Sequence, residues 1–282
     1  MIYILYNPTS NNGNSSEALE AVKKTFEKEQ TTLVNLLEVT DYPALVESFK
    51  NGDKIVLIGG DGTLNRFINY FDGKMIDNEI LFYPAGTGND FLHDVNGNTE
   101  PAFVELGKYI ESLPTVYINE KSYKFINGIG FGIDGYCCEV ADKMKAAGKK
   151  KINYTVIAIK GLLGGFKPCT ATVTVDGVTK VYKKAWLAPT MLGRYFGGGM
   201  DITPDQDRLN PEHTVTNMLM YGHGRLATLI VFPKVFTGEH KDKAMCDFRS
   251  GHEVTVEFDV PCALQVDGET FLNVLKYTVK YE

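Results

Sequence analysis

The chain has 282 residues, of which 44% are hydrophobic, so it is long enough to bury two cores or one large one. Its formal net charge of −6 argues against nucleic acid as a partner, because binding to phosphate backbones needs an excess of lysine and arginine. The five cysteines form no C-x-x-C pair, which argues against a zinc site and a disulfide framework. The apolar runs are too short to cross a bilayer and the first residues lack the basic flank of a signal peptide, so we expect a cytoplasmic protein.

Short apolar strands alternate with helical stretches in the first part of the chain. The pattern predicts strands at 2–7, 31–39, 54–60 and 79–86, and helices at 15–29, at 43–50, after Thr63 and at 103–112. Strands separated by helices of this length indicate βαβ units, and therefore a parallel sheet. We predict a Rossmann-like α/β domain over residues 1–115.

The second part of the chain is rich in β-forming residues. Two strand-like runs flank Asp176-Gly177, a pair that favours a tight hairpin turn, and further strands are predicted at 214–222 and 253–260. Helices are predicted at 152–164 and 225–237. We expect residues 116–282 to form an antiparallel sandwich or barrel, with a C-terminal tail at about 273–282 that packs back on the first domain.

The stretch VLIGGDGTLN, residues 56–65, joins a predicted strand to a predicted helix through three glycines. Backbone N–H groups at such a helix start suit phosphate oxygens. The common phosphate fingerprints fail here, because no G-x-x-x-x-G-K-[ST] occurs and Asn65 replaces the third glycine of the dinucleotide pattern. A complete G-x-G-x-x-G at residues 130–135 lies in the β-rich part and lacks the acidic residue that would follow at about 20 positions, so we discount it.

A second turn repeats this layout. Residues 80–91, ILFYPAGTGNDF, again pass from an apolar strand through small residues to Thr87, Asn89 and Asp90. Because the carboxyl ends of parallel strands share one edge of a sheet, these turns and the first loop, residues 7–16, should converge there. That edge is the predicted binding site.

Four segments together resemble the diacylglycerol kinase catalytic family. They are Asn7-Pro8-Thr9-Ser10, Gly59–Thr63, Gly86–Phe91 and Val266-Asp267-Gly268-Glu269, and they occur in the family's order over nearly the whole chain. The family includes bacterial soluble lipid kinases and the sphingosine and ceramide kinases, and is distantly similar to NAD kinases. The resemblance implies an NAD-kinase-like nucleotide-binding domain followed by a β-sandwich domain for a lipid substrate.

The resemblance also implies roles for individual residues, with ATP and Mg²⁺ as cofactors. Asp267 is implied as general base with Glu269 beside it, while Asp61 is a rival for the base or for a Mg²⁺ ligand. An extended segment would place Asp267 and Glu269 on one face, whereas the Asp-Gly pair equally favours a hairpin. The remaining implied residues are Gly59, Gly60, Gly62 and Thr63 for the phosphates, Asn7, Thr9, Gly86, Thr87, Gly88 and Asn89 for the nucleotide, and Asp90 and Asp134 for the lipid substrate.

The chain departs from the family pattern at three places. Asn11 and Asn12 stand where relatives commonly have a glycine and a basic residue, and Tyr117-Ile118-Asn119 replaces an Asp-Leu-Gly or Asp-Ile-Gly sequence. Residues 206–212, QDRLNPE, replace an Asp-Gly pair that bacterial relatives link with a structural metal. We therefore predict that this metal is absent or rebuilt here.

The leading hypothesis is an ATP-dependent lipid kinase that converts diacylglycerol to phosphatidic acid. The alternatives are an NAD kinase-like enzyme and a catalytically silent protein that binds lipid or nucleotide. Lys149-Lys150-Lys151 precede an apolar helix with Lys160 and Lys167 nearby, which suits either peripheral contact with the inner membrane surface or a core helix with solvated lysines. A homodimer is compatible with the family analogy.

Overall fold

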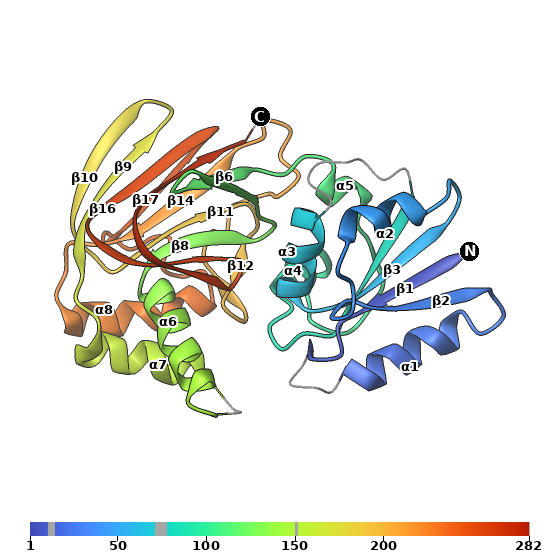
Figure 1. Cartoon of the computed structure of the whole chain (residues 1–282). Helices are drawn as coiled ribbons and strands as arrows, with labels where there is room; N and C mark the ends of the chain where they lie inside the picture. The colour runs from blue at the N-terminus through green and yellow to red at the C-terminus, as the bar shows by residue number, and fades with distance from the viewer. Residues whose placement is uncertain (11–14, 71–77, 150–151, 282) are drawn as a thin grey trace. The chain divides into compact units, whose positions relative to one another are not determined.

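The computed structural model describes residues 1–10, 15–70, 78–149 and 152–281 (Figure 1). Contacts divide the chain into two compact units, Met1–Ser112 and Leu113–Glu282. Each unit is described below by itself. Among the described residues, no helix has the length and apolar character needed to cross a bilayer.

The first unit is built on a five-stranded sheet with the order β2-β1-β3-β4-β5. Its first four strands are parallel, and β5 runs antiparallel to β4. The parallel arrangement confirms the βαβ prediction. The strands are β1 (Ile2–Tyr6), β2 (Thr31–Asn35), β3 (Lys54–Gly59), β4 (Glu79–Pro84) and β5 (Val104–Glu105).

Helices cover both faces of this sheet (Figure 1). Successive strand residues point to opposite faces, so Ile4 and Val56 pack with Val22 of α1 on one side. Leu5 on the other side lines a pocket together with Phe67 of α3. The helices are α1 (Ser15–Thr25), α2 (Tyr42–Ser48), α3 (Asp61–Tyr70), α4 (Asp90–Asn96) and α5 (Gly107–Ile110).

The prediction of a helix at 103–112 was wrong for the first half of this segment. Val104 pairs with Phe82 as part of β5, and the N–H of Leu106 donates to the carbonyl of Ile80 at 2.8 Å. Only the four residues of α5 are helical. Tertiary pairing with the exposed edge of β4 therefore overrode a locally helical pattern.

The second unit contains a ten-stranded, mainly antiparallel sheet. Its path runs β15-β14-β11-β8-β16-β17-β6-β7, while β9 pairs with β10 and β16. The α/β unit followed by this sheet confirms the predicted fold class. The strands are β6 (Thr115–Ile118), β7 (Lys121–Lys124), β8 (Gly128–Gly132), β9 (Cys169–Val175), β10 (Val178–Ala185), β11 (Leu187–Met191), β14 (Val215–Met220), β15 (Cys246–Gly251), β16 (Glu253–Val266) and β17 (Glu269–Lys280), with β12 (Tyr195–Phe196) and β13 (Met200–Asp201) as a separate pair.

Strand β16 connects the two parts of this sheet. Residues 254–258 pair with β9, whereas residues 264–266 pair with β8. The register with β17 shifts between Glu257 and Cys262, around Pro261, which has no backbone N–H to offer the ladder. The irregularity lets one long strand change its partner on one side while it keeps β17 on the other.

The C-terminal residues do not form the separate tail that we predicted. Residues 273–280 continue β17, which pairs with β16 and with β6 of the same unit. Val274, Tyr277 and Val279 are buried in this sheet, so the segment contributes to the core of the second unit. Residue 282 lies outside the described residues.

Helices pack on this sheet around a cluster that includes Trp186 and Leu187. Helix α6 (Ile133–Ala146) was not predicted, because its glycine-rich beginning resembles a strand. The helix predicted at 152–164 is α7 (Tyr154–Lys160) followed by a π-helical turn, η2 (Gly161–Gly165). The helix predicted at 225–237 is α8 (Arg225–Val231) followed by the 3₁₀ turn η3 (Phe232–Phe236).

The predicted hairpin turn at Asp176-Gly177 is confirmed. The two residues have φ values of 45° and 80° and connect β9 to β10. Positive φ at both central positions is the requirement that favours an Asp-Gly pair.

Candidate functional site

The two glycine turns of the first unit lie against each other at the carboxyl ends of β3 and β4. A Cβ atom on Gly60 would approach the Cα of Gly86 to 2.9 Å, and one on Gly86 would approach the Cα of Gly60 to 2.6 Å. The N–H of Ala85 also donates to the carbonyl of Gly59 at 2.7 Å. Close backbone approach therefore explains these glycines, and the structure brings the two predicted turns together.

Asp61 joins the two turns through its side chain. Its carboxylate oxygens accept hydrogen bonds from the backbone N–H groups of Asp90, at 3.1 Å, and Phe91, at 3.0 Å. Asp61 is itself the first residue of α3, so one carboxylate serves the amino-terminal ends of α3 and α4. Asp90 is buried directly beside this contact.

Asn7 and Thr63 connect the first loop to α3. The Nδ2 of Asn7 donates to the Oγ1 of Thr63 at 3.2 Å, and the Oδ1 of Asn7 accepts from the N–H and hydroxyl of Thr9 at 3.0 and 2.7 Å. Thr63 is buried, and its side chain fills the space in which a Cβ on Gly59 would otherwise lie. The first loop thus contributes to the same edge as the two glycine turns, as predicted.

The second turn holds its own shape through Asn89. This residue has a φ of 51°, and its Oδ1 accepts from the N–H of Gly86 at 3.0 Å. Thr87 is exposed at the tip and Gly88 is half-buried. Asn89 therefore stabilises the turn in this structure, whereas Thr87 is open to a ligand.

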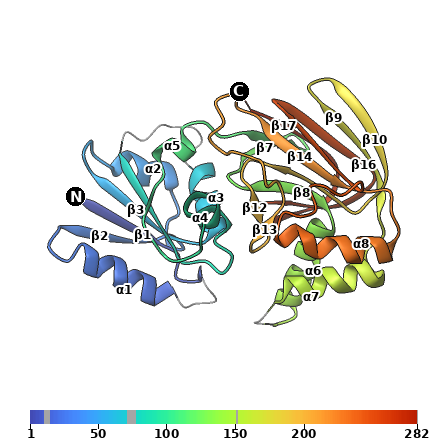
Figure 2. The same ribbon diagram turned by 180° about the vertical axis from the view of Figure 1, so that it is seen from behind.

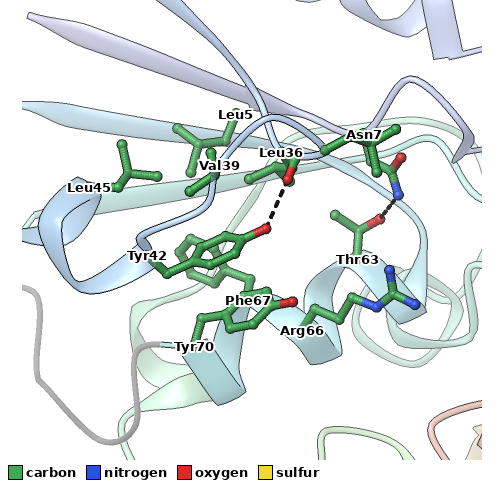
Figure 3. A pocket seen from close by; sticks show the side chains of 11 residues that line it. Leu5, Asn7, Leu36, Val39, Tyr42, Leu45, Thr63, Arg66, Phe67 and Tyr70 are labelled. Carbon is green, nitrogen blue, oxygen red and sulfur yellow. Dashed lines mark hydrogen bonds between the residues drawn. The ribbon is translucent and has the colours of Figure 1, made fainter.

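A cavity of about 240 Å³ begins at Asn7 and Thr63 (Figure 3). The rings of Tyr42 and Tyr70 stack beside it, with centroids 3.7 Å apart and an angle of 11° between their planes. The Tyr42 hydroxyl donates to the carbonyl of Leu36 at 2.9 Å, and burial raises the pKa of this phenol. The lining residues are Leu5, Asn7, Leu36, Leu37, Val39, Tyr42, Leu45, Thr63, Arg66, Phe67 and Tyr70.

In the second unit, Asp267 occupies a tight turn between β16 and β17. Its φ is 44° and that of Gly268 is 88°, so the hairpin alternative for this Asp-Gly pair is confirmed. Its buried carboxylate accepts three backbone N–H groups, from Ile126 at 2.7 Å and from Asn127 and Gly128 at 2.9 Å each. The Asp267 side chain therefore fixes the chain between β7 and β8.

Arg208 holds the same short segment from the other direction. Its guanidinium donates to the carbonyl of Ile126 at 2.9 Å and to the Oδ1 of Asn127 at 3.2 Å. Arg208 is buried although it is a charged residue. A carboxylate and a guanidinium thus bind opposite poles of the peptide groups at residues 126–127.

Glu269 follows the turn and has a different environment from Asp267. It is half-buried and opposite Val266 in the β16–β17 ladder. The hairpin places Asp267 in the tight turn itself and Glu269 at the start of the strand that follows it. They are neighbours in sequence with separate roles in the fold.

Asp134 lies in the first turn of α6, in a space made by small residues. A Cβ at Gly130 would overlap its carboxylate, which explains why the strand before it carries glycine. Neither Asp134 oxygen has a hydrogen-bond partner of normal geometry among the described residues, and the same holds for the buried Nε2 of Gln265. Burial raises the pKa of Asp134 to about 7.

The comparisons with known proteins match both units. Residues 1–113 match the model of the diacylglycerol kinase catalytic domain, and residues 127–278 match the YegS C-terminal NAD kinase beta sandwich-like domain. The chain belongs to the bacterial lipid kinase family that combines these two domains.

Curated relatives and a solved structure agree with this family. A putative lipid kinase, YtlR, of Bacillus subtilis is 24% identical over 72% of each chain, and a diacylglycerol kinase of the same species is 24% identical over 94% of this chain and 88% of its own. A diacylglycerol kinase of Mycobacterium tuberculosis is 26% identical over 68% of this chain and 62% of its own. The crystal structure of a putative diacylglycerol kinase from Bacillus anthracis has the same fold, with a TM-score of 0.71 at 19% identity and coverage of 99% and 91%.

The site of this lipid kinase fits the nucleotide and metal that the family implies. A Cβ on Gly62 would have no neighbouring atom within 4 Å, so the space before the α3 amino terminus can admit phosphate oxygens. Mg²⁺ in kinases binds one or two carboxylates together with substrate phosphates, and Asp61 supplies a carboxylate at this edge.

That the structural metal is absent or rebuilt in this chain remains a prediction. Within the described ranges, no group of three His, Cys, Asp or Glu side chains is placed to hold an ion. Asp207 is exposed, and its Oδ1 accepts the N–H of Leu209 at 2.9 Å. The departure at Asn11 and Asn12 lies outside the described residues.

Sequence reasoning missed three parts of the site. Tyr42 and Tyr70 are 28 positions apart in sequence, and no local pattern predicts that their rings stack. Arg208 stood out only as a departure from the family. Gln265 could have been found as a polar residue in the buried end of β16, just before the turn at Asp267.

Proposed function

We propose that this lipid kinase transfers the γ-phosphoryl group of ATP to a lipid hydroxyl, with diacylglycerol as substrate and phosphatidic acid as product. The observation that carries the proposal is the Asp61 contact, which joins two glycine turns and two helix starts next to an apolar pocket. The names of the relatives support the lipid as acceptor.

The nucleotide is proposed to bind the first unit. Its phosphates lie over Gly60 and Gly62, where backbone N–H groups of α3 and the positive end of its dipole face them. Its base enters the cavity beside Tyr42 and Tyr70, because apolar and aromatic walls suit a planar ring. Bound Mg²⁺ supplies charge neutralisation at the β- and γ-phosphates, with Asp61 as its protein ligand.

The acceptor hydroxyl must lose a proton as its oxygen bonds to the γ-phosphorus and the bond to the β-phosphate oxygen breaks. With Asp61 assigned to Mg²⁺, Asp267 and Glu269 remain as candidates for the base. Both oxygens of Asp267 already accept backbone N–H groups, and protonation would weaken those hydrogen bonds. We therefore assign proton acceptance to Glu269 and a positioning role to Asp267.

Asp134 is proposed to orient the acceptor. With a pKa of about 7 it is partly protonated near neutral pH, so it can donate a hydrogen bond to a lipid oxygen or accept one from a hydroxyl. The Nε2 of Gln265 supplies a second polar atom of the same kind. A ligand oxygen would offer these buried groups a hydrogen-bond partner of normal geometry, which the described chain does not supply.

The test is ADP release by the purified protein with Mg²⁺, ATP and mixed micelles of diacylglycerol, with a lipid-free control. Lipid-dependent release, with phosphatidic acid as product, is the expected result. Glu269→Gln should lower kcat by about 10²- to 10⁴-fold, the range of general base catalysis, while its thermal midpoint stays unchanged.

Two outcomes would contradict the proposal. Phosphorylation of NAD without any response to lipid would identify an NAD kinase-like enzyme. ATP binding seen as thermal stabilisation, with no turnover on diacylglycerol or on a fractionated lipid extract, would identify a silent binding protein.

A further inference from the structure

Two helices of the second unit expose apolar side chains on their outward faces. Val156, Ile159 and Leu163, on α7 and the turn η2, are 43, 44 and 63% exposed, and Leu226 and Ile230 of α8 are 79 and 72% exposed. Their spacings of three and four residues place the members of each set on one face of their helix. A surface helix normally carries polar residues on that face.

The two helices form one surface. The guanidinium of Arg225, at the start of α8, donates to the carbonyl of Leu162 in η2 at 2.9 Å. The inward faces of both segments, including Ile157, Leu162 and Phe232, pack in the same core cluster. Figures 1 and 2 show α7 and α8 side by side from opposite directions. We call Val156, Ile159, Leu163, Leu226 and Ile230 the α7–α8 surface.

The sequence around this surface is rich in positive charge. Residues 143–175 contain seven lysines and no acidic residue, and residues 222–238 contain one arginine, one lysine and no acidic residue. Three of these lysines form ion pairs with acidic residues outside the two segments: Lys143 with Glu139, Lys145 with Asp142, and Lys234 with Glu239. The whole chain has a net charge of −6, so these two segments differ sharply from the rest. Lys160 and Lys167 are exposed next to the apolar side chains, whereas Lys150 and Lys151 lie outside the described residues.

The same surface adjoins the element that carries Asp134. A Cβ on Gly161 would lie 2.6 Å from the Cδ1 of Ile133 and 2.8 Å from the Cε1 of Tyr136, so η2 packs directly on the first turn of α6. Asp134 lies in that turn, with its carboxylate turned into the protein. An acceptor whose polar end reaches Asp134 would have its hydrocarbon tail close to the apolar side chains outside.

We propose that the α7–α8 surface docks on an anionic lipid bilayer, with its apolar side chains among the acyl chains and its lysines at the headgroups. Apolar side chains flanked by lysines match such a surface in both polarity and charge. The inference rests on the proposed function only for the reason why this chain would bind a bilayer. Bilayer binding itself can be measured without phosphoryl transfer.

The experiment is sedimentation with vesicles of phosphatidylcholine alone and of phosphatidylcholine with 30% phosphatidylglycerol. The chain should bind the anionic vesicles, and the variant Leu163→Gln/Leu226→Gln/Ile230→Gln should bind them about 30-fold more weakly. Lys160→Gln/Lys167→Gln should weaken binding at low salt and have little effect at 0.5 M NaCl, where surface charges are screened.

A matched control is available in the same unit. Val178 and Val181 are 66 and 59% exposed on β10, and Val178→Gln/Val181→Gln should leave vesicle binding unchanged. Thermal midpoints close to that of the parent chain would show that each variant is folded. Equal vesicle binding by the triple variant and the parent would overturn the proposal.

Two further measurements separate this proposal from its alternatives. The triple variant should phosphorylate a short-chain diacylglycerol in solution like the parent, yet lose activity on diacylglycerol embedded in vesicles. Inactivity of the parent on both substrates would reject the proposed function. The sedimentation result would still show whether the α7–α8 surface binds anionic bilayers. If the triple variant instead converts a dimer to a monomer in analytical ultracentrifugation and still binds vesicles, the surface joins two copies of the chain and the proposal fails.

Discussion

Replacement of Asp267 by asparagine should unfold the second unit more easily as well as lower activity. The carboxylate accepts three backbone N–H groups, two on Oδ1 and one on Oδ2. An asparagine side chain has one acceptor oxygen, so its NH₂ group must face at least one of these donors. Ile126 would then lose its partner in a buried place.

The size of the effect follows from the number of donors. Hydrogen bonds to a charged group contribute about 1.5–3 kcal/mol each, and a buried N–H without a partner costs a similar amount. We expect Asp267→Asn to lower the free energy of unfolding by about 3 kcal/mol. In a domain of this size, that change lowers the thermal midpoint by about 6–12 °C.

The chain contains a convenient probe for this measurement. Its single tryptophan, Trp186, is buried in the second unit, so its fluorescence reports the unfolding of that unit. Glu269→Gln is the matched control, since half-buried Glu269 should change the free energy of unfolding by less than about 0.5 kcal/mol. An Asp267→Asn variant that melts at the parent temperature would refute the positioning role.

Three further predictions concern the remaining site residues. Gly62→Ala should fold with at least the parent stability, because nothing lies within 4 Å of the new methyl group, but it should raise the KM for ATP. The methyl group of Gly86→Ala would lie 2.6 Å from the Cα of Gly60 in the other turn, so this variant should lower the free energy of unfolding in urea by about 1–3 kcal/mol. Burial raises the pKa of Asp134 to about 7, so the native state binds this proton more tightly and parent stability should fall by about 3 kcal/mol as the pH rises from 4 to 7. Asp134→Asn should lack this fall when unfolding is compared at pH 4 and pH 7. Tyr70→Ala should raise the KM for ATP about 10-fold through loss of ring stacking, whereas Tyr117→Ala, which removes another exposed ring, should not; an equal effect of the two would argue against the nucleotide-base pocket.

The sequence predicted the convergence of the first-unit turns well, because short-range rules determine it. Each glycine turn follows a buried strand, and the parallel order of β3 and β4 then places Gly60 and Gly86 at the same edge. The resemblance to lipid kinases, which rests on the same turns, agrees with this geometry. Asn7 was predicted for the same reason, as it follows β1.

Features that depend on long-range packing were not predictable in this way. The Tyr42–Tyr70 stack needs two helices to meet, and the contact between Arg208 and Ile126 joins residues 82 positions apart. Helix α6 was missed because its first residues, Ile133 to Gly135, follow a glycine-rich strand that hides the helix start. Local propensity is weak at such positions, so tertiary contacts determine the outcome.

The buried guanidinium of Arg208 makes one positive charge in the second unit independent of the metal ions in solution. A guanidinium keeps its charge at every physiological pH, and it is covalently part of the chain. The positive group that binds the Ile126 carbonyl and the Asn127 side chain therefore has no dissociation equilibrium of its own. A chelator or a shortage of divalent ions would remove the Mg²⁺ that we propose to accompany the nucleotide, but it cannot remove this cation from the segment that binds Asp267.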